Sequence, residues 1–412
     1  PLLIIRDPLA IGIYLCALIN GRFPFRASLF FVLMMVFTAS IFAAINGTPP
    51  LVALYGIRID FFHLPLIFIM ADIFDREDVL RIGRAVMWLT IPISLLMIAQ
   101  YLAGEYSWLN VGAGGDTGAQ LRGALGKIRP PGPFSFITGP ILWFPLATAF
   151  TFYGWVHRGI YSRWLLVPVT CLIFIVIPIS VSRMLMLSVL VVVAFGIVTL
   201  LRNPQRALGV FIPLMLIALT YMAIGDGEMT EAFESRWEDS TQGGISASIF
   251  QRYLNEYVVG IETIGHAPIF GHGIGMGSNV GSRYSTGEMG FQLAEAEWAK
   301  IILELGPILG VAFIGFRVWL AVSLLLKAWT RLFTDHDSLS WLICGACVLT
   351  VISGQWAPPT ILGFAVFGAG LTLAAAQPED DYEDEDGIDE DEMSSDFEQD
   401  PDPQENQFST RG

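Results

Sequence analysis

The chain has 412 residues, of which 54% are hydrophobic and only 15% are charged, and its mean hydropathy is +0.59. Soluble domains carry about a quarter charged residues, and this sequence repeats apolar runs near the roughly 20 residues that cross a bilayer. A soluble globular enzyme is therefore excluded. The net charge of −15 lies in one segment, because residues 378–412 hold 16 acidic side chains and one Arg, while the rest balances 22 acidic against 22 basic side chains.

Taken in chain order, the apolar runs predict eleven membrane-spanning helices. Helices are expected because the runs are continuously apolar and do not alternate every second residue. The fold class is thus an all-α polytopic membrane protein with about 11 transmembrane helices, or twelve if the full-length chain has a further leading helix. The ranges are 8–20, 27–46, 50–71, 85–104, 139–156, 164–181, 184–201, 207–224, 299–326, 338–356 and 360–377.

The basic residues of the short connections predict the orientation, since Lys and Arg gather on the cytoplasmic side. One alternating set of connections holds eleven of them, whereas the short loops of the other set hold only Arg183. The eleven are Arg22, Arg26, Arg76, Arg81, Arg84, Arg158, Arg163, Arg202, Arg206, Lys327 and Arg331. This orientation places the long loops outside and the acidic tail in the cytoplasm.

Four regions follow along the chain. Residues 1–224 hold transmembrane helices 1–8 with an outer loop at 105–138, and 225–298 form a large extracytoplasmic loop. Residues 299–377 hold transmembrane helices 9–11. Residues 378–412 have too few apolar side chains to bury and are expected to be a disordered cytoplasmic tail. It is either a solvated tail without a specific role or a docking site for a basic partner.

The loop 225–298 is too long to be a simple connector. Its glycine-alternating run, 271–277, is neither a G-x-G-x-x-G nor a Walker A sequence, so nucleotide binding is rejected. Two interpretations remain open, a backbone nest for an anion and a plain flexible loop. No group of His, Cys or carboxylates has a recognised ligand spacing. We expect no metal and no cofactor, although a metal held mainly by substrate phosphates stays open.

The third range contains three ionisable side chains, Arg58, Asp60 and His63. Such groups at membrane depth are costly and usually face the bundle interior. Arg58 with Asp60 is one candidate pair, either buried or near the outer boundary.

Two segments around the glycine run carry a resemblance. After Arg252 and a helix-like stretch, residues 266–275 read His-Ala-Pro-Ile-Phe-Gly-His-Gly-Ile-Gly. Residues 294–310 then read Ala-Glu-Ala-Glu-Trp-Ala-Lys-Ile-Ile-Leu-Glu-Leu-Gly-Pro-Ile-Leu-Gly. Earlier, Arg129-Pro-Pro-Gly-Pro-Phe and Ser180-Val-Ser-Arg183 precede the fifth and seventh ranges. In order and spacing, this pattern resembles the O-antigen ligase and O-antigen polymerase superfamily of bacterial polysaccharide assembly.

The resemblance implies a GT-C-like membrane glycosyltransferase of the bacterial inner (plasma) membrane. Such enzymes transfer glycan from a polyprenyl diphosphate, such as undecaprenyl diphosphate, to a sugar hydroxyl on the outer face. The implied partners are a polyprenyl-diphosphate-linked oligosaccharide, an acceptor glycan or lipid, membrane lipids and a chain-length regulator, with no nucleic acid. Many ligases of this family carry a His-Asn pair where this chain has Glu295-Ala296. That departure favours a polymerase over a ligase.

The implied reaction assigns roles to particular residues. Guanidinium groups suit a diphosphate leaving group because they stay charged and bind phosphate oxygens bidentately. The candidates, in order, are Arg183, Arg252, Arg129 and Arg122. An acceptor hydroxyl needs a base within hydrogen-bond reach, and the candidates are Glu295, Glu297, His266 and His272.

Each role has a structural alternative. A boundary Arg often only reaches the lipid headgroups. Lys300 shares a helix face with Glu297 and Glu304 and is expected to neutralise them, and Glu304 is expected to brace the helix start. Two other protein classes stay open, an exporter of lipid-linked oligosaccharide or polysaccharide and a scaffold that acts through its tail.

Overall fold

The structure is a computed structural model that describes residues 2–103, 107–110, 128–202, 215, 245–287 and 293–378. The described residues form helices and their connections, without a β-strand among them. This confirms the all-helical class. The chain divides into two units, residues 1–377 and 378–412, and the predicted tail lies outside the described residues apart from Pro378.

Ten of the eleven expected ranges fall on helices of the first unit, and the range 207–224 lies outside the described residues except for Met215. The helices are α1 (Leu2–Ile19), α2 (Ala27–Ile45), α3 (Pro50–Asp60), α4 (Leu64–Ile73), α5 (Arg76–Leu102), α6 (Thr138–Val156), α7 (Arg163–Ile179), α8 (Arg183–Arg202), α11 (Ile245–Ile264), α12 (Asn279–Thr286), α13 (Glu297–Thr334), α14 (Leu339–Ser353) and α15 (Pro359–Ala374), with a 3-10 turn at Trp108–Asn110.

Five segments of the described chain are long and apolar enough to cross a membrane, and three shorter helices are also apolar. The five are Ala27–Ile45, Pro50–Ile73, Arg76–Leu102, Arg183–Arg202 and Glu297–Thr334. The protein is therefore a helical, multi-pass membrane protein. The count of eleven spans and the direction of the loops stay predictions.

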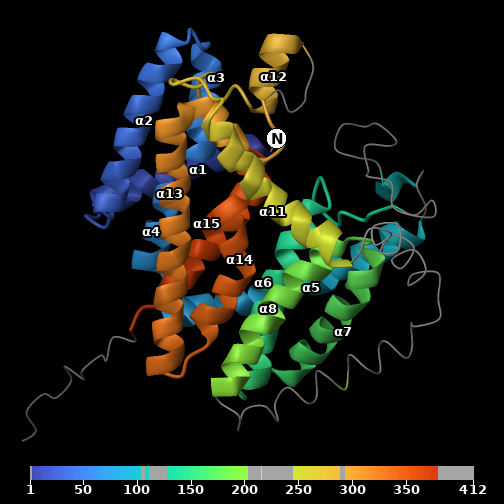
Figure 1. Ribbon diagram of the computed structural model, residues 1–412. Helices are drawn as coiled ribbons and strands as arrows, with labels where there is room; N and C mark the ends of the chain where they lie inside the picture. Colours follow the sequence, from blue (N-terminus) through green and yellow to red (C-terminus); the bar gives the residue numbers. More distant parts are fainter. Residues whose placement is uncertain are drawn as a thin grey trace, which may run out of the picture. The chain divides into compact units, whose positions relative to one another are not determined.

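Two apolar cores hold the helices of the first unit together. The first joins α2, α4 and α13, and the second joins α5, α6, α7 and α8. Helices α14 and α15 contribute to both cores, with Cys344 in the first and Leu342 in the second. Figure 1 shows α13 to α15 between the blue helices α1 and α2 and the group α5 to α8, whose colours run from cyan to green. The site described below depends on this central position of α13.

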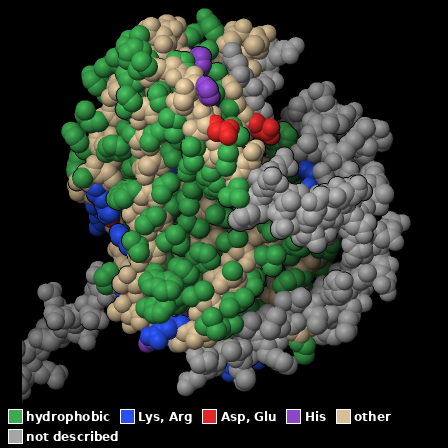
Figure 2. Space-filling model, in the orientation of Figure 1, with side chains coloured by type: hydrophobic (Ala, Val, Ile, Leu, Met, Phe, Trp, Pro, Cys, Tyr) green, Lys and Arg blue, Asp and Glu red, His purple; other side chains and the backbone are tan. Residues whose placement is uncertain are grey.

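The visible surface of the described residues is mostly apolar, as Figure 2 shows, and carboxylates and histidines gather in its upper part. On α2, for example, Phe30, Leu33 and Phe37 are more than 60% exposed. Exposed apolar side chains of this density would drive association in water, but they suit contact with lipid chains.

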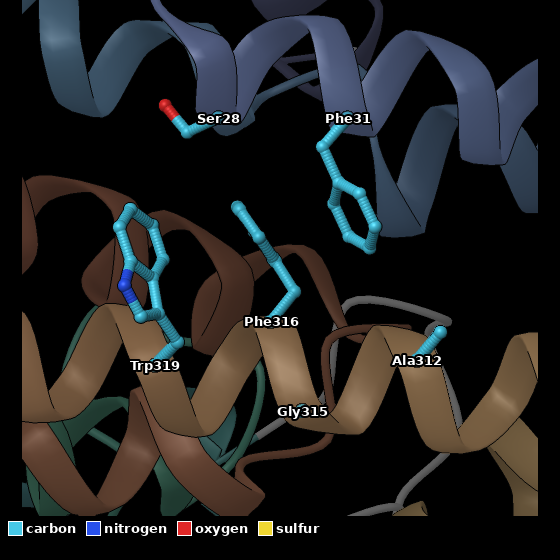
Figure 3. Close-up of a pocket in the computed structure, with 6 residues that line it drawn as sticks. All are labelled: Ser28, Phe31, Ala312, Gly315, Phe316 and Trp319. Carbon is cyan, nitrogen blue, oxygen red and sulfur yellow. The ribbon is translucent and has the colours of Figure 1, made fainter.

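A groove of about 340 Å³ separates part of α2 from α13. Figure 3 shows the rings of Phe31 and Phe316 side by side across it, with centroids 5.9 Å apart. Its lining holds no charged side chain, and it consists of Ser28, Phe31, Ala312, Gly315, Phe316 and Trp319. The groove is therefore an apolar surface, and its lining contains no acid, base or charged group for catalysis.

The third expected range is not one helix. It is broken between α3 and α4 by a turn at Phe61, Phe62 and His63, and α4 restarts with a proline in its first turn. The break brings the buried carboxyl of Asp60 to the end of α3. A broken span in a bilayer requires partners for its freed polar groups, and the site below supplies charged neighbours for Asp60.

Candidate functional site at the head of α13

Helix α13 is interrupted one-quarter of the way along its length. Gly306 has φ 81° and ψ 167°, a conformation open only to glycine, and Pro307 has no N–H. The carbonyls of Leu303 and Glu304 therefore lose their partners within the helix. The N–H of His272 donates to Leu303 O at 2.7 Å, and the N–H of Gly273 donates to Glu304 O at 3.0 Å. The loop thus completes the hydrogen bonding of the broken helix.

The glycine run is a packed segment. Gly271, Gly273 and Gly275 all have positive φ. A Cβ on Gly271 would lie 2.3 Å from Glu304 O, and one on Gly275 would lie 2.2 Å from Val52 O of α3. The run therefore fits between α3 and the break in α13 because it lacks side chains.

Both earlier interpretations of this run need correction. The flexible loop is wrong, because the run is held by buried contacts on both sides. An open anion nest is also wrong for three of its N–H groups. Those of His272, Gly273 and Gly277 already donate to Leu303 O, Glu304 O and Glu304 Oε1. An anion would have to displace these bonds.

Five buried ionisable side chains lie at this end of α13, and we call them the buried charge cluster. They come from α3 and α13, and none is more than 4% exposed. Their chemistry combines three carboxyl groups with one ammonium and one guanidinium. The members are Asp60, Glu297, Lys300, Glu304 and Arg317.

Arg317 is the centre of the cluster's pairing. Its Nη1 donates to Glu297 Oε1 at 3.2 Å. Its Nε and Nη2 donate to Val351 O at 2.9 Å and Gly354 O at 2.7 Å, at the end of α14. The guanidinium also lies 3.9 Å from the centroid of the Trp356 ring, which is a cation–π contact. A fully buried guanidinium with all these partners fixes α13 to the segment after α14.

Glu297 and Lys300 form an ion pair, with Lys300 Nζ 3.5 Å from Glu297 Oε2. This confirms the prediction that Lys300 neutralises a carboxylate on its own helix face. Glu304 Oε1 accepts the N–H of Gly277 at 2.6 Å, so this side chain joins α13 to the glycine run, while its bracing of the helix start stays a prediction.

The suggested pair of Arg58 with Asp60 is wrong. Arg58 Nε donates to Asp7 of α1, whereas Asp60 has Lys300, Glu297 and Arg317 as its electrostatic neighbours. The physical reason is that residues two apart on a helix point to different sides. His63 Nε2 lies 3.4 Å from Asp7 Oδ1, so Asp7 is the acidic neighbour of both Arg58 and His63.

Helix α11 packs against α13 and caps it. The Glu256 carboxylate accepts the backbone N–H groups of Glu297 and Trp298, which have no partner within the helix. Tyr257 meets Trp298 edge-to-face at 4.7 Å, and Trp298 Nε1 donates to Ile352 O at 3.2 Å. Burial at this junction raises the pKa of the Glu256 carboxyl above its ordinary value.

The candidate bases gather at this end of α13 but differ in exposure. His266, His272 and Glu295 have exposed side chains. Glu295 O accepts Gln355 Nε2 at 2.7 Å, which anchors its backbone beside the end of α14. Glu297 is 1% exposed and is held by two cations. The exposed three are accessible to a substrate, whereas Glu297 is buried in ion pairs with Lys300 and Arg317.

The candidate donor-binding arginines are more scattered. Arg183 is half-buried at the first residue of α8, and Arg129 is half-buried nine residues before the start of α6. Arg252 lies on α11, within the part whose side chains are not described, and Arg122 lies outside the described residues. The structure therefore fixes the backbone position of three of the four.

Sequence reasoning missed Arg317, Trp356 and Glu256. A single Arg inside the apolar range 299–326 was a signal for Arg317, since an intramembrane charge needs a partner. Trp356 and Glu256 carried no comparable signal, because their partners lie 39 and 41 residues away in the sequence.

No group of three or more His, Cys, Asp or Glu side chains suited to a metal ion occurs among the described residues. Comparisons with protein-family models, curated proteins and solved structures find no match for this chain.

Proposed function

We propose that the protein is a membrane glycosyltransferase of surface-polysaccharide assembly. It would transfer glycan from a polyprenyl diphosphate to a sugar hydroxyl on the outer face. One observation supports this most directly. The two segments behind the resemblance, 266–275 and 294–310, pack together at the break in α13. They leave His266, His272 and Glu295 exposed at one end of the helix.

The reaction requires a base and a site for the leaving group. The acceptor oxygen attacks the anomeric carbon as the bond from that carbon to the diphosphate oxygen breaks. A base removes the hydroxyl proton, and Glu295 is the first candidate, followed by His266 and His272. The negative charge that develops on the diphosphate favours guanidinium partners, for which Arg183 and Arg252 are the first candidates. Glu297, already paired to Arg317 and Lys300, positions the start of α13.

Polymerase is favoured over ligase within this proposal. The position of the ligase His-Asn pair holds Glu295-Ala296. A carboxylate can replace an imidazole as a proton acceptor, so the change keeps the base and alters its chemistry.

The alternative is an exporter of lipid-linked oligosaccharide. The buried charge cluster favours it to some extent, because ionisable groups inside membrane spans often mark a transport path. The exposed His266, His272 and Glu295 favour the transferase.

The test compares surface glycan and polyprenyl-linked oligosaccharide, by gel and mass spectrometry, in cells with and without the gene. A polymerase predicts loss of long chains with single repeats retained. Full-length chains held on the lipid carrier would instead indicate a ligase, and subunits trapped in the cytoplasmic leaflet an exporter. An unchanged profile would contradict the glycan function.

Arg183→Lys and Arg202→Lys form a matched pair for the leaving-group role, since they occupy opposite ends of α8. Lys keeps the charge but loses the bidentate geometry. We expect shortened glycan for Arg183→Lys and normal glycan for Arg202→Lys. Equal effects of the two substitutions would contradict a specific role for Arg183.

A further inference from the structure

The buried charge cluster has an unbalanced charge. Asp60, Glu297 and Glu304 bring three carboxyl groups, whereas Lys300 and Arg317 bring two positive charges. If every group were ionised, a net charge of −1 would lie in a region where each side chain is at most 4% exposed. Such an uncompensated charge is strongly disfavoured away from water.

Among the side chains that the structure describes, the groups that face the cluster do not supply the missing positive charge. On the described part of α11 the titratable neighbour is Glu256, another carboxyl. The end of α14 contributes the carbonyls of Val351 and Gly354, together with the ring of Trp356. The glycine run contributes the N–H of Gly277. Within the described residues, the electrostatic neighbours of Asp60 and Glu304 are the other members of the cluster.

Two oxygen atoms of the cluster also lack hydrogen-bond partners. Both oxygens of Glu297 are engaged, one by Arg317 and Trp356 N–H and the other by Lys300. Glu304 Oε1 accepts the N–H of Gly277. Glu304 Oε2 and Asp60 Oδ1 are buried without a partner. These two atoms belong to carboxyl groups that interact electrostatically with each other.

We propose that the cluster is a binding site for one proton, shared between Asp60 and Glu304. One added proton brings the net charge to zero. A protonated carboxyl also becomes a hydrogen-bond donor, and Asp60 and Glu304 are the two cluster carboxyls that each have a buried oxygen without a partner. This inference is independent of the glycosyltransferase proposal, since it depends only on the charges and contacts of the cluster.

The proton site is coupled to the outer loop through Glu304. This side chain holds Gly277, and the carbonyl of the same residue accepts the N–H of Gly273. Loss of the proton would leave two like charges, one on α3 and one on α13, in the same buried cluster beside the glycine run. Repulsion between them would loosen the run from the break in α13.

The test uses the full chain in lipid nanodiscs and infrared spectroscopy of the carbonyl stretch of protonated carboxylic acids. Wild type should show this band at neutral pH, and exchange into D2O should shift it. Asp60→Asn and Glu304→Gln should each abolish the band, because either change leaves the cluster neutral without a proton. Lys300→Met should increase it, because two protons are then required.

Glu295→Gln is the matched control, since this carboxyl is exposed beside the cluster, and it should leave the band unchanged. Absence of the band in wild type would overturn the proposal, as would persistence of the band in both Asp60→Asn and Glu304→Gln. A band that appears only after sodium is replaced by choline would also overturn it, because the positive charge would then be a sodium ion.

A second measurement avoids reliance on any variant that does not fold. Hydrogen exchange of residues 266–278 in wild type, corrected for the intrinsic pH dependence, should accelerate as pH rises. Exposed segments of α12 should not show this acceleration. The coupling between the proton site and the loop would be contradicted if the hydrogen-exchange protection of 266–278 stayed constant over the pH range in which the infrared band disappears.

Discussion

At the scale of single residues, Arg317 is the clearest determinant of the site. Breaking a buried ion pair by removing one partner costs about 3–5 kcal/mol. We therefore expect Arg317→Met to lower the free energy of unfolding by about this amount, because the buried Glu297 carboxylate loses one of its two cationic partners and keeps only Lys300. The measurement is thermal or denaturant unfolding of the protein in detergent.

Two further variants make this prediction sharp. Adding Glu297→Gln to Arg317→Met should recover part of the loss, since the carboxylate that lost its guanidinium partner is then removed as well. Arg81→Met is the control, because Arg81 is 66% exposed and pairs at the surface with Glu77 and Asp78, where a pair contributes at most about 1 kcal/mol. Equal losses for Arg317→Met and Arg81→Met would contradict the account.

Glu256 predicts a pH dependence of stability. Burial raises the pKa of its carboxyl above the ordinary value, so the folded protein holds this proton more tightly than the unfolded chain. The free energy of unfolding should then fall as pH rises from the ordinary pKa of Glu to the raised one. In Glu256→Gln this part of the pH profile should flatten, whereas Glu262→Gln, an exposed site on the same helix, should retain it. Identical profiles for Glu256→Gln and wild type would refute the assignment.

At the scale of elements, the break in α13 depends on Gly306. A Cβ there would lie 2.2 Å from Ile269 O, at φ 81°. Strain of this kind costs roughly 1–3 kcal/mol, so Gly306→Ala should destabilise the protein by at least that much and detach the glycine run. The readout is thermal unfolding together with hydrogen exchange of 266–278.

Gly315 on the same helix is the matched control. A Cβ there meets no atom within 4 Å, and Ala in a helix interior is favoured over Gly by about 0.5–1 kcal/mol. Gly315→Ala should therefore be neutral or stabilising. If Gly306→Ala and Gly315→Ala destabilised the protein equally, the positive φ of Gly306 would not be the reason why the break in α13 depends on this residue.

The sequence predicted the helices better than it predicted their interruptions. Continuous apolar runs indicated ten of the described helical segments, because burial in lipid requires about 20 apolar residues in a row. The turn at Phe61 to His63 was missed, although Pro65, in the first turn of α4, was a visible signal for a new helix start. The Gly306-Pro307 pair was a visible signal for the break in α13. The hydrogen bonds from the loop N–H groups to the carbonyls of Leu303 and Glu304 could not be predicted, because only the fold brings these segments together.

The site was predictable in part for the same reason. Helical spacing within α13 correctly joined Lys300 to Glu297. Spacing could not reveal that Asp60 of α3 completes this cluster, because that contact spans more than 230 residues.

At the scale of the whole molecule, the predicted orientation places the loop before α13 outside and the turn after it in the cytoplasm. In a Cys16→Ser background, a membrane-impermeant maleimide added to intact cells should label His266→Cys. His336→Cys, which is also exposed, should react only after the membrane is opened. The reverse pattern would invert the topology and with it the side on which the proposed reaction occurs.

The measurement that tests the central claim most directly is a transfer assay with purified protein in liposomes. The liposomes contain a polyprenyl-diphosphate-linked oligosaccharide, and products are read by mass spectrometry. The account predicts lengthened lipid-linked glycan with release of free polyprenyl diphosphate, both reduced in Glu295→Gln. Movement of the donor between leaflets without any new glycosidic bond would contradict the transferase and indicate an exporter.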